Sequence, residues 1–258
     1  MPLMSSHGGD GTSAVTVEQS LKRDLALACR ILAATGQGDT IFGHVSARLS
    51  GWNRFWMKPA GMGLEEVCED DLVLLDFQGR TLAGHRPRHE EYPIHAEIMR
   101  ARSEVLAVVH THPRFSIALA ARGVELRPVS HEGSFFWPPG VPIFDAFTDL
   151  VRTREQGEAV ARALGNGRAV FLRNHGIAVP GTSVAEACCA AIMLERAAEL
   201  QLLAHPSAEA TFLHTPEGEA RAKQAIWSPE RLRSIFEYYA RMVAGTEPAN
   251  TTSTKRRS

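Results

Sequence analysis

Two histidines separated by one residue are the most chemically informative feature of this sequence. His110 and His112 flank Thr111 at the end of an apolar stretch, and Pro113 follows them. Alternate residues of an extended segment point to the same side, so both imidazoles could face one metal ion. Pro113 prevents continuation of a strand, which places the pair at a strand end, where sites are often built. Alone, this spacing is a weak signal, because core and surface histidines also occur in such pairs.

A third candidate ligand, His175, lies beside Gly176 at the end or in the middle of another apolar segment. Three imidazoles with an open fourth position are typical of a catalytic zinc-type site. Mn²⁺, Fe²⁺ and Co²⁺ also suit this set, because three neutral nitrogens select geometry more than the identity of the metal.

Carbon chemistry at a metal also needs a group that carries protons. Glu90 and Glu91 lie just before Pro93, where a helix is expected to begin. Adjacent carboxylates commonly do no more than favour a helix N-terminus through the helix dipole. On the residues alone, an acid/base role and this structural role both remain open.

Alternating helices and strands must position these side chains, and their apolar periodicity and start signals can be recognised in the sequence. Helices are expected over 17–35, 93–102, 114–123, 184–204 and 229–243. Strands are expected over 41–50, 54–60, 72–77, 105–110 and 168–174, and residues 175–179 could either continue the last strand or follow its end. Helices that flank a block of strands predict an α/β fold.

The length and charge of the chain narrow the class of protein. Its 258 residues fit one large domain, which we place at 16–245, between tails at 1–15 and 246–258 that we expect to be disordered. With 28 basic and 29 acidic residues the net charge is -1, which argues against a nucleic-acid partner. No apolar run approaches the roughly 18 residues of a membrane span, so we expect no membrane association.

The N-terminal residues and the cysteines predict the compartment. The first residues have neither the charged nor the apolar region of a secretory signal. The four cysteines form no C-x-x-C pair, so we expect ordinary thiols in a reducing cytoplasm. A cytoplasmic protein is therefore predicted.

Five short motifs together resemble the class II aldolase/adducin family, the family of fuculose-phosphate aldolase and ribulose-phosphate 4-epimerase. Each motif is weak alone, but their order is specific, and the resemblance covers about residues 17–205. The motifs are Gly43-His44-Val45-Ser46, Lys58-Pro59-Ala60-Gly61, Glu91-Tyr92-Pro93-Ile94-His95, Ala107-Val108-Val109-His110-Thr111-His112-Pro113 and Asn174-His175-Gly176.

The resemblance assigns roles to the candidate residues. It implies that His110, His112 and His175 bind one divalent metal per chain, with zinc as the first choice and Mn, Fe or Co as alternatives. It implies that Glu91 is the acid/base. It also implies a three-layer α/β/α fold with a central mixed, largely antiparallel sheet. A homotetramer with active sites at subunit interfaces is a further implication.

Departures from the family pattern bear on the substrate. Sugar-phosphate members hold the phosphate with an asparagine, a T-G turn and a serine pair, where this chain has His44, Ala60-Gly61 and His89-Glu90. A carboxylate at Glu90 would repel a phosphate, so we expect phosphate recognition to be lost. The candidate substrate-binding residues, several of which could hold a carboxylate, are His44, Ser46, Gly61, Arg88, His89, His131, Tyr238 and Tyr239.

Family members that lack the phosphate-binding residues, and are similar to this chain in G-H-V-S, include decarboxylases of hydroxylated aromatic or pyridine dicarboxylic acids. The resemblance therefore implies a divalent-metal-dependent carbon–carbon lyase acting on a non-phosphorylated carboxylated small molecule. The first choice is a decarboxylase of a hydroxylated aromatic or heteroaromatic acid. The alternative is an aldolase or epimerase for a small hydroxy acid or sugar. A non-catalytic adducin-like binding module is less favoured, because the adducin branch loses the metal histidines that this chain keeps.

Overall fold

An eight-stranded sheet forms the centre of the protein, in a computed structural model that describes residues 10–204 and 215–244. The strand order is β4-β3-β2-β1-β5-β8-β7-β6, and all neighbours are antiparallel except the parallel pair β6 and β7. The expected mixed, largely antiparallel sheet is confirmed. The strands are β1 (His44–Ala47), β2 (Arg54–Met57), β3 (Val73–Asp76), β4 (Thr81–Ala83), β5 (Ala107–Thr111), β6 (Ile143–Phe144), β7 (Val170–Leu172) and β8 (Gly176–Gly181).

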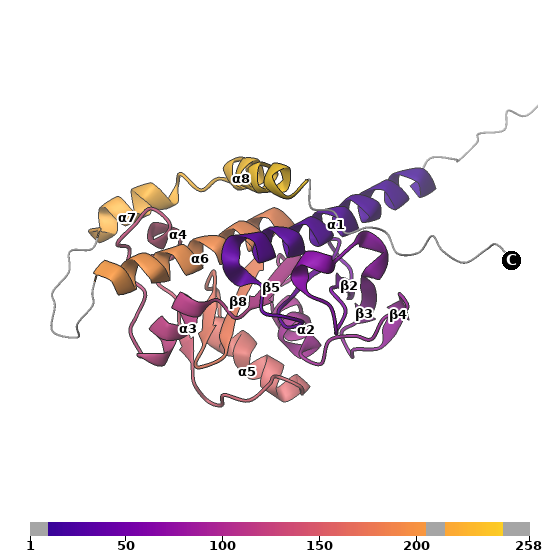
Figure 1. Ribbon diagram of the computed structural model, residues 1–258, viewed down its shortest axis with the longest axis horizontal. Helices are drawn as coiled ribbons and strands as arrows, with labels where there is room; N and C mark the ends of the chain where they lie inside the picture. Colours follow the sequence, from indigo (N-terminus) through magenta and orange to yellow (C-terminus); the bar gives the residue numbers. More distant parts are fainter. Residues whose placement is uncertain (1–9, 205–214, 245–258) are drawn as a thin grey trace, which may run out of the picture.

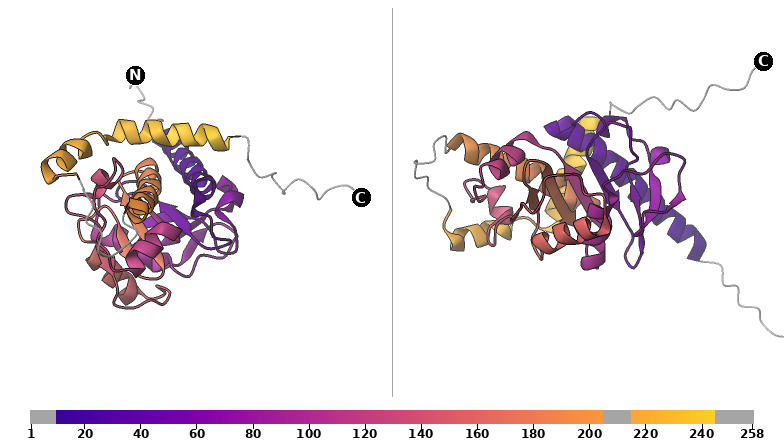
Figure 2. Two further views of the ribbon diagram at one scale, coloured as in Figure 1. Left: turned by 60° about the vertical axis from the view of Figure 1, so that its left-hand side comes forward. Right: turned by 90° about the horizontal axis from the view of Figure 1, so that it is seen from below.

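Helices cover both faces of this sheet (Figure 1). On one face, α2 (Tyr92–Ala101) packs against α5 (Arg154–Leu164). On the other face lie α1 (Asp10–Leu32) and α6 (Val184–Ala204). Outside these two helices, α8 (Pro229–Val243) packs against both, as Figure 2 shows from two further directions. The predicted three-layer α/β/α arrangement is therefore confirmed, with α8 added on one side.

Two hydrophobic cores hold the layers together, one on each face of the sheet. The larger core includes Leu25 of α1, Val109 of β5 and Ala191 of α6. The smaller core includes Ile98 of α2 and Val108 of β5. Because successive residues of a strand face opposite sides, β5 contributes to both cores and is buried along its whole length. The strand that leads into the histidine pair is thereby fixed from both faces.

The four predicted helices after the first are confirmed, with ends that differ by only a few residues from the expected ranges. The predicted helix α3 and several shorter helical segments occupy the connections between the main elements. They are η1 (Ala33–Gln37), η2 (Leu64–Glu66), η3 (Glu69–Asp71), α3 (Arg114–Ala121), α4 (Gly133–Phe136) and α7 (Glu217–Gln224).

The N-terminal boundary differs from the prediction. We expected a disordered tail over 1–15 and a helix from Val17, but α1 begins at Asp10. The Ser/Gly/Thr-rich composition of this stretch carries no apolar periodicity from which a helix could be recognised. Residues 1–9 and the predicted C-terminal tail lie outside the described residues.

In the segment 168–179, the prediction left open whether one strand continues through residue 175. Residues 173–175 form a turn, and β7 and β8 pair as an antiparallel hairpin. Asn174 makes this turn with a left-handed backbone (φ 57°), a conformation that asparagine tolerates better than most residues. His175 therefore lies in a hairpin turn and not within a strand.

One buried arginine ties the sheet to the α2–β5 connection. Arg48, directly after β1, is 5% exposed, and its guanidinium donates hydrogen bonds to five main-chain carbonyls. Its Nε lies 2.9 Å from the Val105 oxygen and one terminal nitrogen lies 2.9 Å from the Met99 oxygen. Since α2 follows Glu91 and β5 leads into the histidine pair, this contact fixes two of the elements that build the site.

No helix within the described residues is long and apolar enough to cross a membrane. Cys29, Cys188 and Cys189 are buried and Cys68 is half-buried, and none of the four forms a disulfide, which confirms them as thiols. Burial raises the pKa of Cys29 and of Cys189 to about 12, so both thiols stay protonated near neutral pH.

Candidate active site

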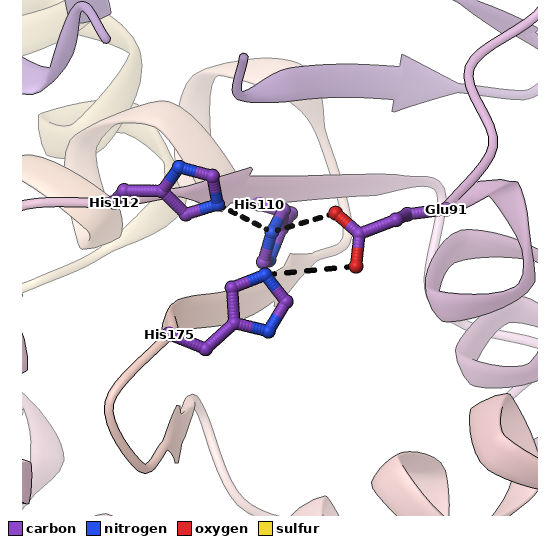
Figure 3. Close-up of side chains that lie close together, drawn as sticks. All are labelled: Glu91, His110, His112 and His175. Carbon is purple, nitrogen blue, oxygen red and sulfur yellow. Dashed lines mark hydrogen bonds and ion pairs between the residues drawn. The ribbon is translucent and has the colours of Figure 1, made fainter. Parts of the chain in front are cut away.

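Three neighbouring segments of the sheet bring the predicted metal ligands together. His110 lies in β5, where it pairs with His44 of β1 across the antiparallel register. His112 follows the end of β5, and the turn between β7 and β8 supplies His175. Glu91 approaches them from the first residue before α2, as Figure 3 shows. One nitrogen or oxygen of each of these four side chains lies within 4.8 Å of the others.

In His110 and His112, a hydrogen bond made by Nδ1 determines that Nε2 is the nitrogen left with a lone pair. The Nδ1 of His110 donates to the Ile177 carbonyl at 2.9 Å, and the Nδ1 of His112 donates to the Asp39 carboxylate at 2.9 Å. In a neutral imidazole with Nδ1–H, Nε2 carries a lone pair. The two Nε2 atoms lie 3.1 Å apart, so two lone pairs face each other.

His175 supports the same interpretation. Its Nε2 is buried and makes no hydrogen bond with any described residue. A buried polar atom without a partner is costly unless something else satisfies it. A divalent cation would satisfy three converging nitrogens of this kind at once, and three histidines are a common ligand set of catalytic metal sites. The residues present therefore fit a divalent metal.

Glu91 faces all of these nitrogens and is 2% exposed. Its Oε2 lies 3.6 Å from His110 Nε2 and 3.7 Å from His44 Nε2, while its Oε1 lies 3.5 Å from His175 Nε2. The main-chain N–H of Val151 donates to Oε1 at 2.9 Å and orients the carboxylate. Burial opposes its ionisation, but the close approach of the His110, His175 and His44 imidazoles holds the pKa of Glu91 below its usual range.

A chain of buried side chains lies behind Glu91. His44 Nδ1 lies 2.6 Å from His95 Nε2, and His95 Nδ1 lies 2.7 Å from the Ser46 hydroxyl. All three residues are completely buried. Burial, together with the neighbouring histidines, lowers the pKa of His44 and of His95, so both rings are neutral near pH 7. The chain fixes the orientation of His44 relative to Glu91.

His89 is held in the opposite tautomer from the metal ligands. The main-chain N–H of Glu91 donates to its Nδ1 at 3.3 Å, so in the neutral ring Nε2 carries the proton. Burial and the charge of Lys58 lower the pKa of His89 to about 4, which keeps it neutral. His89 packs against His44 with 3.9 Å between ring centroids. Although His44, His89 and Glu91 also lie close together, this tautomer makes His89 a donor and a poor metal ligand.

The remaining candidate substrate residues are more dispersed. Gly61 adopts a left-handed backbone (φ 76°) in the turn after β2, and the exposed Arg88 stacks on Tyr92 at 4.5 Å. His131 is exposed ahead of α4. On α8, Tyr238 is 54% exposed, whereas Tyr239 is 8% exposed and packs in the larger core. The structure does not bring these last three side chains into the histidine cluster.

Glu90 differs from what the sequence suggested. We expected its charge to stand unpaired near the substrate, but its side chain is 68% exposed and Arg152 donates to it at 2.8 Å. Repulsion by Glu90 is therefore a weaker reason for excluding a phosphate than the absence of hydroxyl donors.

A large cavity adjoins two of the predicted metal ligands. Its volume is about 950 Å³, and His112 and His175 form part of its wall. Apolar, charged and neutral polar side chains share the rest of the lining, among them Phe42, Arg114, Phe115, Asn174, Ile192 and Arg196.

Sequence reasoning missed several groups that organise the site. His95 stands in a recognised motif four residues after Glu91, a helical spacing that could have indicated proximity. The Val151 N–H and the Ile177 carbonyl are main-chain groups, which carry no sequence signal. Asp39 lies in an irregular turn far from the histidines in sequence, so only the fold places it beside His112.

This fold and this cluster of three histidines and a glutamate define a class of protein, and the sequence matches it. The chain belongs to the class II aldolase and adducin family, because residues 23–202 match the family's N-terminal domain. Within the family it is 34% identical to a 3,4-dihydroxyphthalate decarboxylase of Arthrobacter keyseri over 192 residues, 69% of this chain and 76% of the relative. It is 35% identical to a protein of the same name from Terrabacter sp., over 69% of this chain and 78% of the relative.

The fold is similar to a solved L-fuculose 1-phosphate aldolase from Glaciozyma antarctica. The TM-score is 0.79 at 25% identity, and the match covers 95% of this chain and 97% of the other. The expected family and fold are therefore both confirmed.

Proposed function

We propose that this protein is a divalent-metal-dependent decarboxylase of a hydroxylated aromatic carboxylic acid. The observation that carries the proposal is the buried group of His110, His112, His175 and Glu91, in which nitrogen lone pairs and a carboxylate converge. The similarity to two 3,4-dihydroxyphthalate decarboxylases supports the choice of reaction.

His110, His112 and His175 would hold the metal through their Nε2 atoms. Zinc is the first choice, with Mn²⁺, Fe²⁺ or Co²⁺ as alternatives. A divalent metal supplies Lewis acidity, which stabilises negative charge on a substrate oxygen next to the bond that breaks.

Glu91 would carry the proton that decarboxylation requires. Its low pKa makes the carboxylate the resting form, so it can accept the proton of a phenolic hydroxyl beside the departing carboxylate. It then delivers that proton to the ring carbon as the carbon–carboxylate bond breaks, and the bonding pair of electrons remains with the ring to form the new C–H bond. The products are CO₂ and a phenolate, which takes a proton from water.

A neutral hydrogen-bond donor would hold the substrate's carboxylate without adding a positive charge beside Glu91. His89 has its proton on Nε2 and is fixed against His44. A neutral N–H donor binds a carboxylate by a hydrogen bond and leaves the negative charge in place, so CO₂ can depart. Ser46 would act indirectly, through His95 and His44.

A second candidate function is aldol cleavage or epimerisation of a small hydroxy acid or sugar. The match to the L-fuculose 1-phosphate aldolase over nearly the whole chain favours it. Both reactions collect negative charge on an oxygen adjacent to the breaking carbon–carbon bond, so the same residues would serve.

The product released on turnover tests the proposal and separates the two functions. With 3,4-dihydroxyphthalate as the probe, we expect CO₂ and 3,4-dihydroxybenzoate, formed by loss of the carboxylate beside the hydroxyl. The matched control is Glu91→Gln, which should release neither. Aldehyde release from hydroxy acids or sugars, with no CO₂ from hydroxylated aromatic acids, would support the aldolase and contradict the decarboxylase.

A further inference from the structure

His110 and His112, which flank Thr111, differ in the hydrogen-bond partner of Nδ1. His110 Nδ1 donates to a neutral main-chain carbonyl, that of Ile177. His112 Nδ1 donates to a carboxylate, Asp39 Oδ2, at 2.9 Å. The Asp39 side chain is 45% exposed, whereas that of His112 is 15% exposed. The negative charge therefore lies at the rim of the site, on the far side of the imidazole from Nε2.

The turn that carries Asp39 is held in place by contacts of its own. The main-chain N–H of Phe42 donates to the Asp39 carbonyl at 2.9 Å and closes the turn. Two residues earlier, the Gln37 side-chain oxygen accepts a hydrogen bond from the Thr111 hydroxyl at 2.6 Å. The end of η1 and the turn after it thus contact the consecutive residues Thr111 and His112, so the position of Asp39 is fixed relative to His112.

We propose that Asp39 is a positioning residue for the metal site. It accepts the Nδ1–H of His112, which keeps the lone pair of that ring on Nε2 and aims it at the other ligands. Its negative charge makes the imidazole a stronger donor to a cation. A carboxylate that hydrogen-bonds a metal-ligating histidine commonly changes metal affinity by about 10–100-fold. The inference rests on the proposed metal site but concerns affinity, so it can be tested without turnover.

Two substitutions separate the hydrogen bond from the charge. Asp39→Ala removes both, and we expect the Zn²⁺ dissociation constant to rise about 10–100-fold. Asp39→Asn keeps an oxygen that can accept from Nδ1 but has no charge, so an intermediate loss is expected. Asp70→Asn is the matched control, because Asp70 is an exposed carboxylate of η3 and its loss changes the net charge equally.

The measurement is competition for Zn²⁺ between the metal-free protein and a chromophoric chelator at one fixed pH. The visible absorption spectrum of the Co²⁺-loaded proteins is a second readout, which should change in both Asp39 variants and not in Asp70→Asn. The unfolding midpoints of the metal-free proteins check for a purely structural effect. If Asp39→Ala does not fold, Asp39→Asn alone decides.

The possible failures can be told apart. A wild-type protein that binds Zn²⁺ with the same affinity as both Asp39 variants would overturn the role of Asp39 and leave the metal site intact. A lowered unfolding midpoint with unchanged affinity would do the same. A wild-type protein that binds neither Zn²⁺ nor Co²⁺ would overturn the proposed metal site together with this inference.

Discussion

At the scale of single residues, the neighbour of each imidazole decides what that imidazole can do. Where Nδ1 donates, as in His110 and His112, Nε2 is left as a lone pair for a cation. Where Nδ1 accepts, as in His89, Nε2 carries the proton of the neutral ring and can donate it to a hydrogen bond. Contacts outside the motifs therefore decide whether the Nε2 of a histidine offers a lone pair or a proton.

Glu91→Gln tests the proton carrier. Glutamine keeps the size of glutamate but cannot exchange a proton near neutral pH. If Glu91 carries the proton, kcat should fall by about 10²–10⁴-fold while metal content stays unchanged. Steady-state kinetics with a metal assay on the same sample measure both quantities.

The competing role for Glu91 is structural, since it directly precedes α2. In that case the substitution would change the free energy of unfolding by about 0.3–1 kcal/mol and leave kcat nearly unaltered. A fully metallated variant with wild-type kcat would remove Glu91 from the mechanism.

The candidate site residues could be predicted from the sequence where they belong to a motif. Glu91, His110, His112 and His175 were recognised in this way, and the structure places them together. Asp39 could not be found, because its contact with His112 depends on how the turn after α1 meets the end of β5. Such a contact between distant segments leaves no periodicity in the sequence.

At the scale of elements, apolar periodicity predicted most of the helices and the strands that build the centre of the sheet. The hairpin turn at 173–175 was hidden because apolar residues lie on both sides of it. The two edge strands β4 and β6 were also missed. Their three and two residues are too short for a periodic pattern, and β4 is exposed along its length.

Arg48→Met tests whether the Arg48 guanidinium stabilises the connection between α2 and β5. The substitution leaves up to five buried or half-buried carbonyls without their donor. We expect the free energy of unfolding to fall by about 2–5 kcal/mol, because unsatisfied buried polar groups are costly. Denaturant unfolding of the metal-free proteins measures this loss.

Arg241→Met is the matched control for this substitution. Arg241 is exposed on α8, so its change should stay within about 0.5 kcal/mol. Equal stability of Arg48→Met and Arg241→Met would mean that the carbonyls find other partners and that Arg48 does not join these elements.

At the scale of the whole molecule, two cores on opposite faces of one sheet give a rigid frame. The predicted metal ligands lie where the central strands end, so this frame fixes their positions relative to one another. The homotetramer with sites at subunit interfaces stays a prediction. The exposed Tyr238 could reach a site only in a neighbouring subunit, whereas Tyr239 packs in the larger core of its own chain. Light scattering of the purified protein would give the oligomeric state.

The buried thiols predict how stability depends on pH. Burial raises the pKa of Cys29 to about 12, whereas an unfolded thiol has a pKa of about 8.5. Between these values the unfolded chain has lost a proton that the folded chain keeps, so stability falls as pH rises. Each such thiol should contribute about -1.4 kcal/mol per pH unit above pH ~8.5 and nothing below it.

Comparison with a variant isolates this effect from the other groups that titrate at high pH. Cys29→Ala and Cys189→Ala should each flatten the decline in the free energy of unfolding between about pH 9 and 11 relative to wild type. Denaturant melts at several pH values measure the slopes. Identical slopes in all three proteins would show that these thiols ionise equally in the folded and unfolded states.

The central claim is that His110, His112 and His175 hold a catalytic metal ion, and elemental analysis tests it most directly. Protein purified without chelators should contain about one divalent metal ion per chain. His112→Ala should lose most of this metal and keep its circular dichroism spectrum, because an open catalytic site is not needed for folding. The account would be contradicted by wild-type protein with only trace Zn, Mn, Fe and Co, or by undiminished metal in the His112→Ala variant.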